Sequence, residues 1–186
     1  MKLSVFKPAV MLFVVTLVSG LLLGVANAVT APQAAEQERL TLMRDLDEIF
    51  PGAQFNELPS EDNNIVKCYE ALDANANVIG YVLETAPNGY GGPVQVLTGI
   101  NMDQTVARIV VGTHSETPGL GANAANASFT DQYIGKSGTL NVIKQGTPGQ
   151  SDIAAITSAT ITSTAVTTGV NTSLEYFTTT LKGGAN

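Results

Sequence analysis

Ile156-Thr157-Ser158-Ala159-Thr160-Ile161-Thr162-Ser163 is a run of small and hydroxylated residues that leads directly into the clearest helical pattern of this 186-residue chain. Apolar residues then recur at steps of three or four positions, namely Ala165-Val166, Val170, Leu174, Phe177 and Leu181. This spacing predicts a helix with one apolar face. Such a face has to be covered, so the preceding part of the chain must supply a second layer.

Strand-like runs separated by turn residues precede this helix. They lie at residues 65–72, 78–84, 94–100, 106–111 and 140–144, and the loops at 73–77 and 101–104 join two pairs of them as hairpins. Hairpins give antiparallel strands. We therefore expect an α+β fold, in which an antiparallel sheet is packed against helices.

The start of the C-terminal helix is also a candidate binding site. Small side chains let the backbone approach a bulky group, and the first amide N–H groups of a helix lack partners within it. These N–H groups and the helix dipole favour a phosphate. An ordinary Ser/Thr helix cap would show the same residue types, so the run by itself leaves both interpretations open.

The N-terminus has the composition of a membrane anchor. Residues 9–31 contain no charged side chain, and about 20 residues of helix span the hydrocarbon core of a bilayer. Lys2 and Lys7 precede this stretch, whereas Glu36 and Glu38 follow it. Because basic residues stay on the cytoplasmic side, we expect a cytoplasmic N-terminus at residues 1–8 and a single-pass helix at 9–31 in the cell membrane. The rest of the chain would then lie on the outer face.

A cleaved signal peptide is the competing interpretation of the N-terminus. Ala26-Asn27-Ala28 has the small side chains of a cleavage site. The apolar stretch is long for a signal peptide, and Pro8 stands at its start, so we favour a retained anchor. Pro32 is expected to break the helix, which then resumes with apolar residues from Leu40 to Phe50. We interpret residues 32–60 as a helical stalk or linker and residues 61–186 as the domain.

The region at residues 112–138 is long, rich in small residues and without a clear period. Loops of this length in a compact domain are usually functional or disordered. This loop contains Glu116-Thr117-Pro118-Gly119-Leu120-Gly121, in which Pro118-Gly119 predicts a turn, the glycines permit close backbone approach to a flat ring, and Leu120 offers an apolar contact. A plain surface turn would also explain the proline and glycines. Tyr90 lies in a further glycine-rich segment, Gly89-Tyr90-Gly91-Gly92-Pro93.

These three segments together resemble the FMN-binding domain shared by RnfG, a component of the Rnf-type electron-transport complex, and NqrC, a component of the Na⁺-translocating NADH:quinone oxidoreductase. The resemblance implies that a flavin transferase attaches FMN through a phosphoester to Thr160, within a motif that also comprises Thr157, Ser158 and Ala159. It further implies cofactor-binding roles for Glu116, Thr117, Gly119, Leu120, Gly121 and Tyr90. Ser158 stands where the family usually has glycine, and Ala154 stands where it usually has an acidic residue.

Chain length favours the RnfG type over the NqrC type. Rnf complexes couple electron flow between reduced ferredoxin and NAD⁺ to the movement of Na⁺ or H⁺, and this chain would relay electrons through its FMN. The resemblance implies a redox subunit without its own catalytic site. It also implies that the chain assembles with other membrane and redox subunits, and that the phosphoester makes it a phosphoprotein. The alternatives are the NqrC type, a cofactor-free anchored binding domain of the same fold, and a flavin domain of another extracellular reductase.

Composition argues against several other functions. The formal net charge of −7 leaves no basic stripe for nucleic acid. His114 is the only histidine and Cys68 the only cysteine, so we expect no metal site and no internal disulfide. Cys68 lies in a strand-like run and is expected to be a core thiol. We interpret His114 as a loop residue near the flavin, because electron transfer needs no general base.

Overall fold

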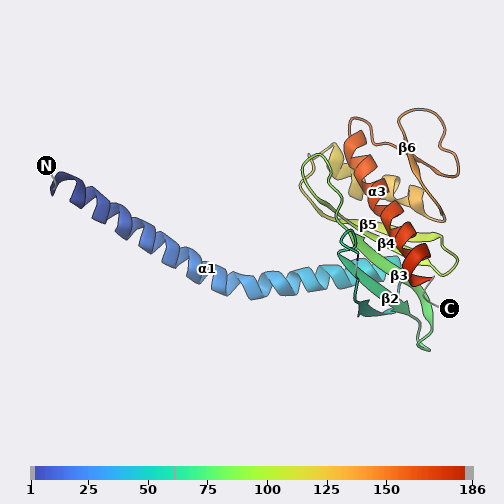
Figure 1. Ribbon diagram of the computed structural model, residues 1–186, viewed down its shortest axis with the longest axis horizontal. Helices are drawn as coiled ribbons and strands as arrows, with labels where there is room; N and C mark the ends of the chain where they lie inside the picture. The colour runs from blue at the N-terminus through green and yellow to red at the C-terminus, as the bar shows by residue number, and fades with distance from the viewer. Residues whose placement is uncertain (1–2, 61, 183–186) are drawn as a thin grey trace. The chain divides into compact units, whose positions relative to one another are not determined.

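The computed structural model describes residues 3–60 and 62–182 (Figure 1). The chain divides into two compact units, one reaching to Arg44 and one beginning at Asp45. Helix α1 (Leu3–Ile49) forms the first unit up to Arg44, and its last residues, from Asp45 to Ile49, belong to the second unit. The predicted topology depends partly on Lys2, and the predicted start and end of the domain are residues 61 and 186. All three lie outside the described residues.

Helix α1 is long and apolar enough over Phe6–Ile49 to cross a membrane, judged by length and composition. The side chains from Phe6 to Leu40 are exposed, as expected of a segment that needs an apolar solvent. The predicted break at Pro32 is wrong, because Pro32 lies inside the continuous helix. Proline removes one helical N–H, but the residues that follow it are mainly Ala, Glu, Gln and Arg, which are strong helix formers.

The second unit is built on a five-stranded antiparallel sheet in which each strand pairs with the next along the chain. The strands are β1 (Gln54–Leu58), β2 (Lys67–Leu72), β3 (Val78–Thr85), β4 (Val94–Asn101) and β5 (Val106–His114). Four of them and both hairpin loops are where the sequence predicts them. Strand β1 falls within the predicted helical stalk. It lies at the sheet edge and is largely exposed, so it lacks the apolar alternation that marks a half-buried strand.

Helix α3 (Thr160–Tyr176), extended by the π-helical turn η3 (Phe177–Leu181), packs across one face of the sheet (Figure 1). Its residues Val166, Val170 and Leu174 are buried in one cluster with strand residues such as Leu83 and Val96. Removing each such side chain from water stabilises the fold by about 1.5–3 kcal/mol. The predicted C-terminal helix and its apolar face are confirmed.

The last residues of α1 and the residue after it also pack against the sheet. Ile49 and Phe50 are buried, and their side chains fill the space that Cβ atoms at Gly99 and Gly80 would occupy. The two glycines therefore let this helix end approach the sheet closely. The last turn of the predicted stalk helix, from Leu46 onward, is thus packed on the fold.

Short elements replace the long irregular loop that the sequence predicts after β5. They are η1 (Gly121–Ala125), α2 (Ala127–Thr130) and η2 (Asp131–Tyr133). Phe129 and Tyr133 anchor this segment in the core, and the Tyr133 hydroxyl lies 2.7 Å from the Thr167 hydroxyl of α3. Strand β6 (Asn141–Ile143) pairs in parallel with β7 (Asp152–Ala154), which brings the chain to the start of α3. Cys68 is fully buried, and burial raises the pKa of its thiol to about 11, so it is a core thiol.

Candidate functional site

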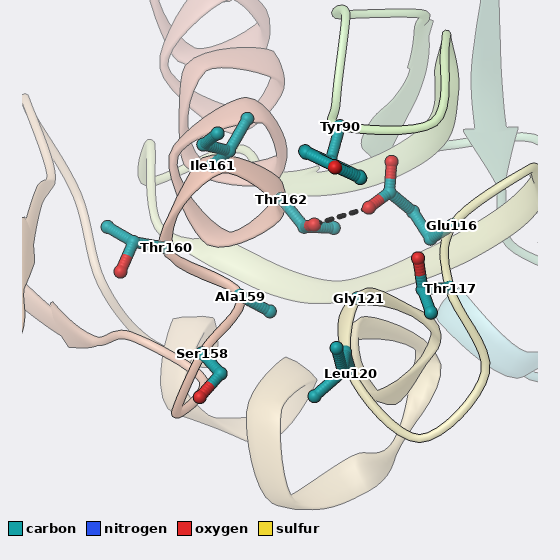
Figure 2. A pocket seen from close by; sticks show the side chains of 10 residues that line it. All are labelled: Tyr90, Glu116, Thr117, Leu120, Gly121, Ser158, Ala159, Thr160, Ile161 and Thr162. Carbon is teal, nitrogen blue, oxygen red and sulfur yellow. Dashed lines mark hydrogen bonds between the residues drawn. The ribbon is translucent and has the colours of Figure 1, made fainter.

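Three segments that are distant in sequence enclose a hollow of about 490 Å³ at the start of α3 (Figure 2). Its lining residues are Tyr90, Glu116, Thr117, Leu120, Gly121, Ser158, Ala159, Thr160, Ile161 and Thr162. Eight of the ten residues predicted for the site are among them. Thr157 and Gly119 are in the same loops but do not line the hollow. Ile161 and Thr162 line it without having been predicted as site residues, although both belong to the run that suggested the site.

Thr160 is the first residue of α3 and is half-buried. Among the described residues, its hydroxyl has no hydrogen-bond partner. Its side chain points away from Glu116 and Leu120 (Figure 2), and it also lines a second hollow of about 400 Å³ that contains Lys144. A group attached to the Thr160 hydroxyl would therefore start at the boundary between the two hollows.

The neighbouring threonines differ from Thr160 in their environment. Thr162 is buried, and its hydroxyl donates a hydrogen bond of 2.5 Å to Glu116 Oε2. Thr157 is exposed and lines neither hollow. Of these three hydroxyls, the one on Thr160 alone is both unpaired among the described residues and part of a hollow. The structure thereby separates three residues that look equivalent in the sequence.

No side chain among the described residues caps the start of α3. The residue before the helix is Ala159, and no side-chain cap hydrogen bond is formed there. The first helical bond runs from Ser163 N–H to the Ala159 carbonyl at 3.0 Å. The amide N–H groups of Thr160, Ile161 and Thr162, in the first turn of α3, therefore have no acceptor within the helix. An ordinary Ser/Thr cap, the alternative interpretation of this run, is therefore not what the structure contains.

Ser158 occupies the left-handed backbone region, with φ +63°. A positive φ makes the replacement of glycine by serine energetically costly, because glycine adopts positive φ freely and residues with a Cβ do not. The replacement of the usual glycine therefore strains this loop. Ala154, at the position of the usual acidic residue, lies in β7, where both of its backbone groups bond the Gln132 amide.

Glu116 is the one charged side chain that the described residues place in the wall of the hollow, and only 6% of its surface is exposed. Its carboxylate accepts hydrogen bonds from Thr162 and from the Gly91 backbone N–H, the latter at 2.9 Å. Burial acts to raise the pKa of the Glu116 carboxyl, but the bonds from Thr162 and from the Gly91 and Tyr90 amides outweigh it, and the net pKa is lowered. The carboxyl is therefore ionised at neutral pH.

The glycines of the Glu116–Gly121 loop have two different roles. Gly119 has φ +78° and open space around it, so its role is conformational. Gly121 is buried against Glu116 and Thr162, where a Cβ would collide with both side chains. The sequence suggested that both glycines let the backbone approach a flat ring; at Gly121 the close neighbour is the protein itself. His114 Nδ1 accepts the Glu116 backbone N–H at 3.3 Å and does not line the hollow.

Comparison with known proteins places this geometry in a family. The FMN-binding domain family matches residues 89–175, a range that contains all ten predicted site residues, and the RnfG N-terminal region matches residues 1–49. The G component of the Na(+)-translocating ferredoxin:NAD(+) oxidoreductase complex of Acetobacterium woodii is 39% identical, over 93% of this chain and 91% of the relative. The chain belongs to the RnfG family of ion-translocating oxidoreductase complexes. The corresponding component of the proton-translocating complex of Clostridium ljungdahlii is 32% identical over 95% and 93% of the two chains.

Solved structures share the fold of this RnfG family member. The NqrC protein of Shewanella oneidensis matches with a TM-score of 0.57 and 17% identity, over 68% of this chain and 69% of that one. The C component of the Na(+)-translocating NADH-quinone reductase of Parabacteroides distasonis matches with a TM-score of 0.51 and 24% identity, over 60% of each chain. These similarities confirm the predicted α+β fold. The NqrC alternative is supported in its fold alone, whereas the RnfG relatives match over almost the whole chain.

The family assignment confirms the predicted resemblance and the FMN-binding domain. It makes the chain a subunit of an oxidoreductase complex, and helix α1 is able to span a membrane. Within the described residues, no group of three or more His, Cys, Asp or Glu side chains could hold a metal ion. The roles of individual residues in the hollow stay predictions.

Proposed function

We propose that this chain carries electrons on an FMN that is joined by a phosphoester to the Thr160 hydroxyl, as a subunit of an ion-translocating ferredoxin:NAD⁺ oxidoreductase complex. The observation that carries the proposal is the environment of Thr160. Its hydroxyl is unpaired among the described residues, lies at the start of a 17-residue helix and lines two hollows. The names of the relatives in A. woodii and C. ljungdahlii supply the class of complex.

The surroundings of Thr160 suit a phosphate. The helix start offers backbone N–H groups and the positive end of the helix dipole. Lys144 lines the hollow on the other side of Thr160 and offers a cation. These features support an ester at Thr160, where the phosphate carries negative charge, more than at Thr162, whose hydroxyl lies next to the Glu116 carboxylate.

The hollow also suits a flat apolar ring. Tyr90, Leu120 and Ile161 line it and remain 72%, 42% and 57% exposed. Exposed apolar side chains that are grouped around one hollow are typical of a ligand-binding surface. FMN, when bound, supplies the electron-transfer chemistry. The part of this chain is to position the ring between these side chains and to set the charge around it.

We further propose the membrane arrangement predicted from the sequence. Residues 9–31 form the anchor, the N-terminus lies in the cytoplasm, and the FMN-binding domain lies on the outer face. Positive charge before the helix supports this orientation. A flavin transferase attaches the cofactor during maturation, and the other subunits of the complex donate and accept the electrons.

The test is the mass of the full-length chain produced together with a flavin transferase. We expect an added mass of FMN minus one water, on the peptide that contains Thr160. Thr160→Val should remove it, whereas Thr162→Val should retain it in the folded protein. An adduct on Thr157 or Thr162 would contradict the assignment. A folded wild-type chain that stays colourless would favour the alternative, a cofactor-free binding domain, for which the strained Ser158 is the supporting observation.

A further inference from the structure

The buried Glu116 carboxylate is held by neutral hydrogen-bond donors. Within the part of the chain that the structure describes, no lysine or arginine forms an ion pair with it. Its hydrogen-bond donors are the Thr162 hydroxyl and the backbone N–H groups of Gly91 and Tyr90. The Thr162 and Gly91 donors contact different carboxylate oxygens, at 2.5 and 2.9 Å. A buried charge is costly unless it is hydrogen-bonded. A carboxylate kept in this state by neutral donors is expected to have a purpose that a neutral side chain would not meet.

Glycines surround this carboxylate on several sides. A Cβ at Gly89 would collide with Glu116 Oε1, and one at Gly121 would collide with Oε2. A Cβ at Gly91 would collide with the carbonyl of Ser115, the residue before Glu116. Gly89 and Gly121, from two separate segments, leave the space that the Glu116 carboxylate fills, and Gly91 leaves space for the backbone just before it. This packing is an observation independent of the hydrogen bonds.

Glu116 therefore joins the three segments that form the hollow. It lies in the loop after β5, it binds the Gly89–Gly92 turn that carries Tyr90, and it binds the first turn of α3 two residues after Thr160. A change in its position would move Tyr90 and the helix start relative to each other. Tyr90 and the residues at this helix start both line the hollow (Figure 2).

We propose that Glu116 is a positioning residue with a second, electrostatic role: it fixes the wall of the hollow and, as a negative charge there that no lysine or arginine pairs among the described residues, lowers the reduction potential of the bound FMN. The inference rests on the proposed function, because it concerns an FMN in this hollow. A flavin becomes more negative when it accepts an electron. A fixed negative charge in a poorly solvated wall opposes this change, and the effect is larger than it would be in water.

Glu116→Gln separates the charge from the positioning role. The amide oxygen can accept the Gly91 N–H, and the amide NH₂ can donate to the Thr162 hydroxyl, which is able to accept as well as donate. The tie is thus retained while the charge is lost. Glu175→Gln is the matched control, because Glu175 is an exposed carboxylate on the same helix and lies outside the hollow.

The experiment uses the full-length chain, produced with a flavin transferase and purified in detergent. Intact mass measures the FMN adduct, and a spectroelectrochemical titration measures the midpoint potential. We expect Glu116→Gln to retain the adduct and to shift the potential to a more positive value, with Glu175→Gln indistinguishable from the wild type. A flavinylated Glu116→Gln protein with the wild-type potential would overturn the electrostatic role.

A second variant decides the question if Glu116→Gln does not fold. Glu116→Asp keeps the charge but shortens the side chain by one methylene, so that it no longer reaches both donors. We expect a potential close to that of the wild type and a lower unfolding midpoint. An unfolding midpoint equal to the wild type's would overturn the positioning role. If the wild type itself lacked FMN, the proposed function would fail. The unfolding midpoint of FMN-free Glu116→Asp would still test whether Glu116 holds the three segments together.

Discussion

The Thr162 hydroxyl donates a hydrogen bond of 2.5 Å to the Glu116 carboxylate and so joins residues 46 positions apart in the sequence. Two positions earlier, the Thr160 hydroxyl has no partner among the described residues. The same type of side chain therefore has two different environments within one turn of helix. The Thr162 hydroxyl is paired with a buried carboxylate, and the Thr160 hydroxyl is the one that we propose for FMN attachment.

This contrast predicts that the same substitution lowers stability at Thr162 far more than at Thr160. Thr162→Val should lower the free energy of unfolding by about 1.5–3 kcal/mol, because it removes a hydrogen bond to a charged group and leaves that group buried. Thr160→Val should change it by less than about 0.5 kcal/mol in the FMN-free protein, because its hydroxyl has no partner. Denaturant unfolding of both FMN-free variants measures the difference. Thr162→Ser, which keeps the hydroxyl, is the control, and equal losses in the two valine variants would contradict the contrast.

Ser158 predicts a stabilising substitution. Ser158→Gly should relieve a left-handed backbone strain of about 1–2 kcal/mol. Glycine also gives the unfolded chain more conformational entropy, which destabilises the folded protein by about 0.4–1 kcal/mol. The expected net gain in the free energy of unfolding therefore lies between roughly 0 and 1.6 kcal/mol, with about 0.8 kcal/mol at mid-range. Ser158→Ala keeps the Cβ and should bring no gain. Thermal unfolding of the two variants measures the difference. A glycine variant that is less stable than the alanine variant would show that the strain at residue 158 is smaller than the entropy cost of glycine.

Gly121→Val tests the packing beneath the hollow. The new side chain would collide with Glu116 and Thr162, and overpacking of this kind costs about 1–3 kcal/mol. We expect a lower unfolding midpoint and a shifted flavin absorbance or potential, with slower electron transfer through the complex. The protein should still carry the ester at Thr160 and remain in the membrane. An unchanged spectrum, potential and turnover would mean that this loop does not contribute to the site.

The contribution of Glu116 to stability should depend on pH. Its pKa is lowered in the folded protein from an ordinary value of 4.5, because the hydrogen bonds to the carboxylate outweigh the effect of burial. A group of this kind stabilises the fold fully above its unfolded pKa, and the stabilisation is lost as the pH falls through the folded value. Between pH 7 and pH 3, the difference in unfolding free energy between wild type and Glu116→Gln should shrink. A difference that is constant over this range would contradict the lowered pKa.

The membrane orientation is tested with intact cells. If Lys2 and Lys7 hold the N-terminus in the cytoplasm, a protease added to right-side-out spheroplasts should digest the domain from the outside. Protection of the domain until the membrane is opened would reverse the orientation. A mature chain that begins after Ala28 would instead identify a signal peptide. The N-terminal sequence of the purified protein distinguishes these outcomes.

The sequence was informative where local physics decides the structure. Strand-like runs between turn residues predicted strands β2 to β5, and a helical apolar pattern predicted helix α3, because a buried helix face requires a regular spacing. Strand β1 was missed because it is a polar edge strand that pairs only with β2. Helix α1 was expected to break at Pro32, but helix-forming neighbours carry it through.

The sequence by itself determined which residue types gather at the site, because the threonine run and the glycine-rich loops can be read without coordinates. Only the tertiary structure decided which partners each residue has there. Thr160 and Thr162 differ because Glu116, which is remote in sequence, binds one hydroxyl and not the other. Gly119 and Gly121 differ because one needs a positive φ and the other needs the space that Glu116 fills. A side chain's partners come from chain segments that the fold brings together, and no local pattern contains that information.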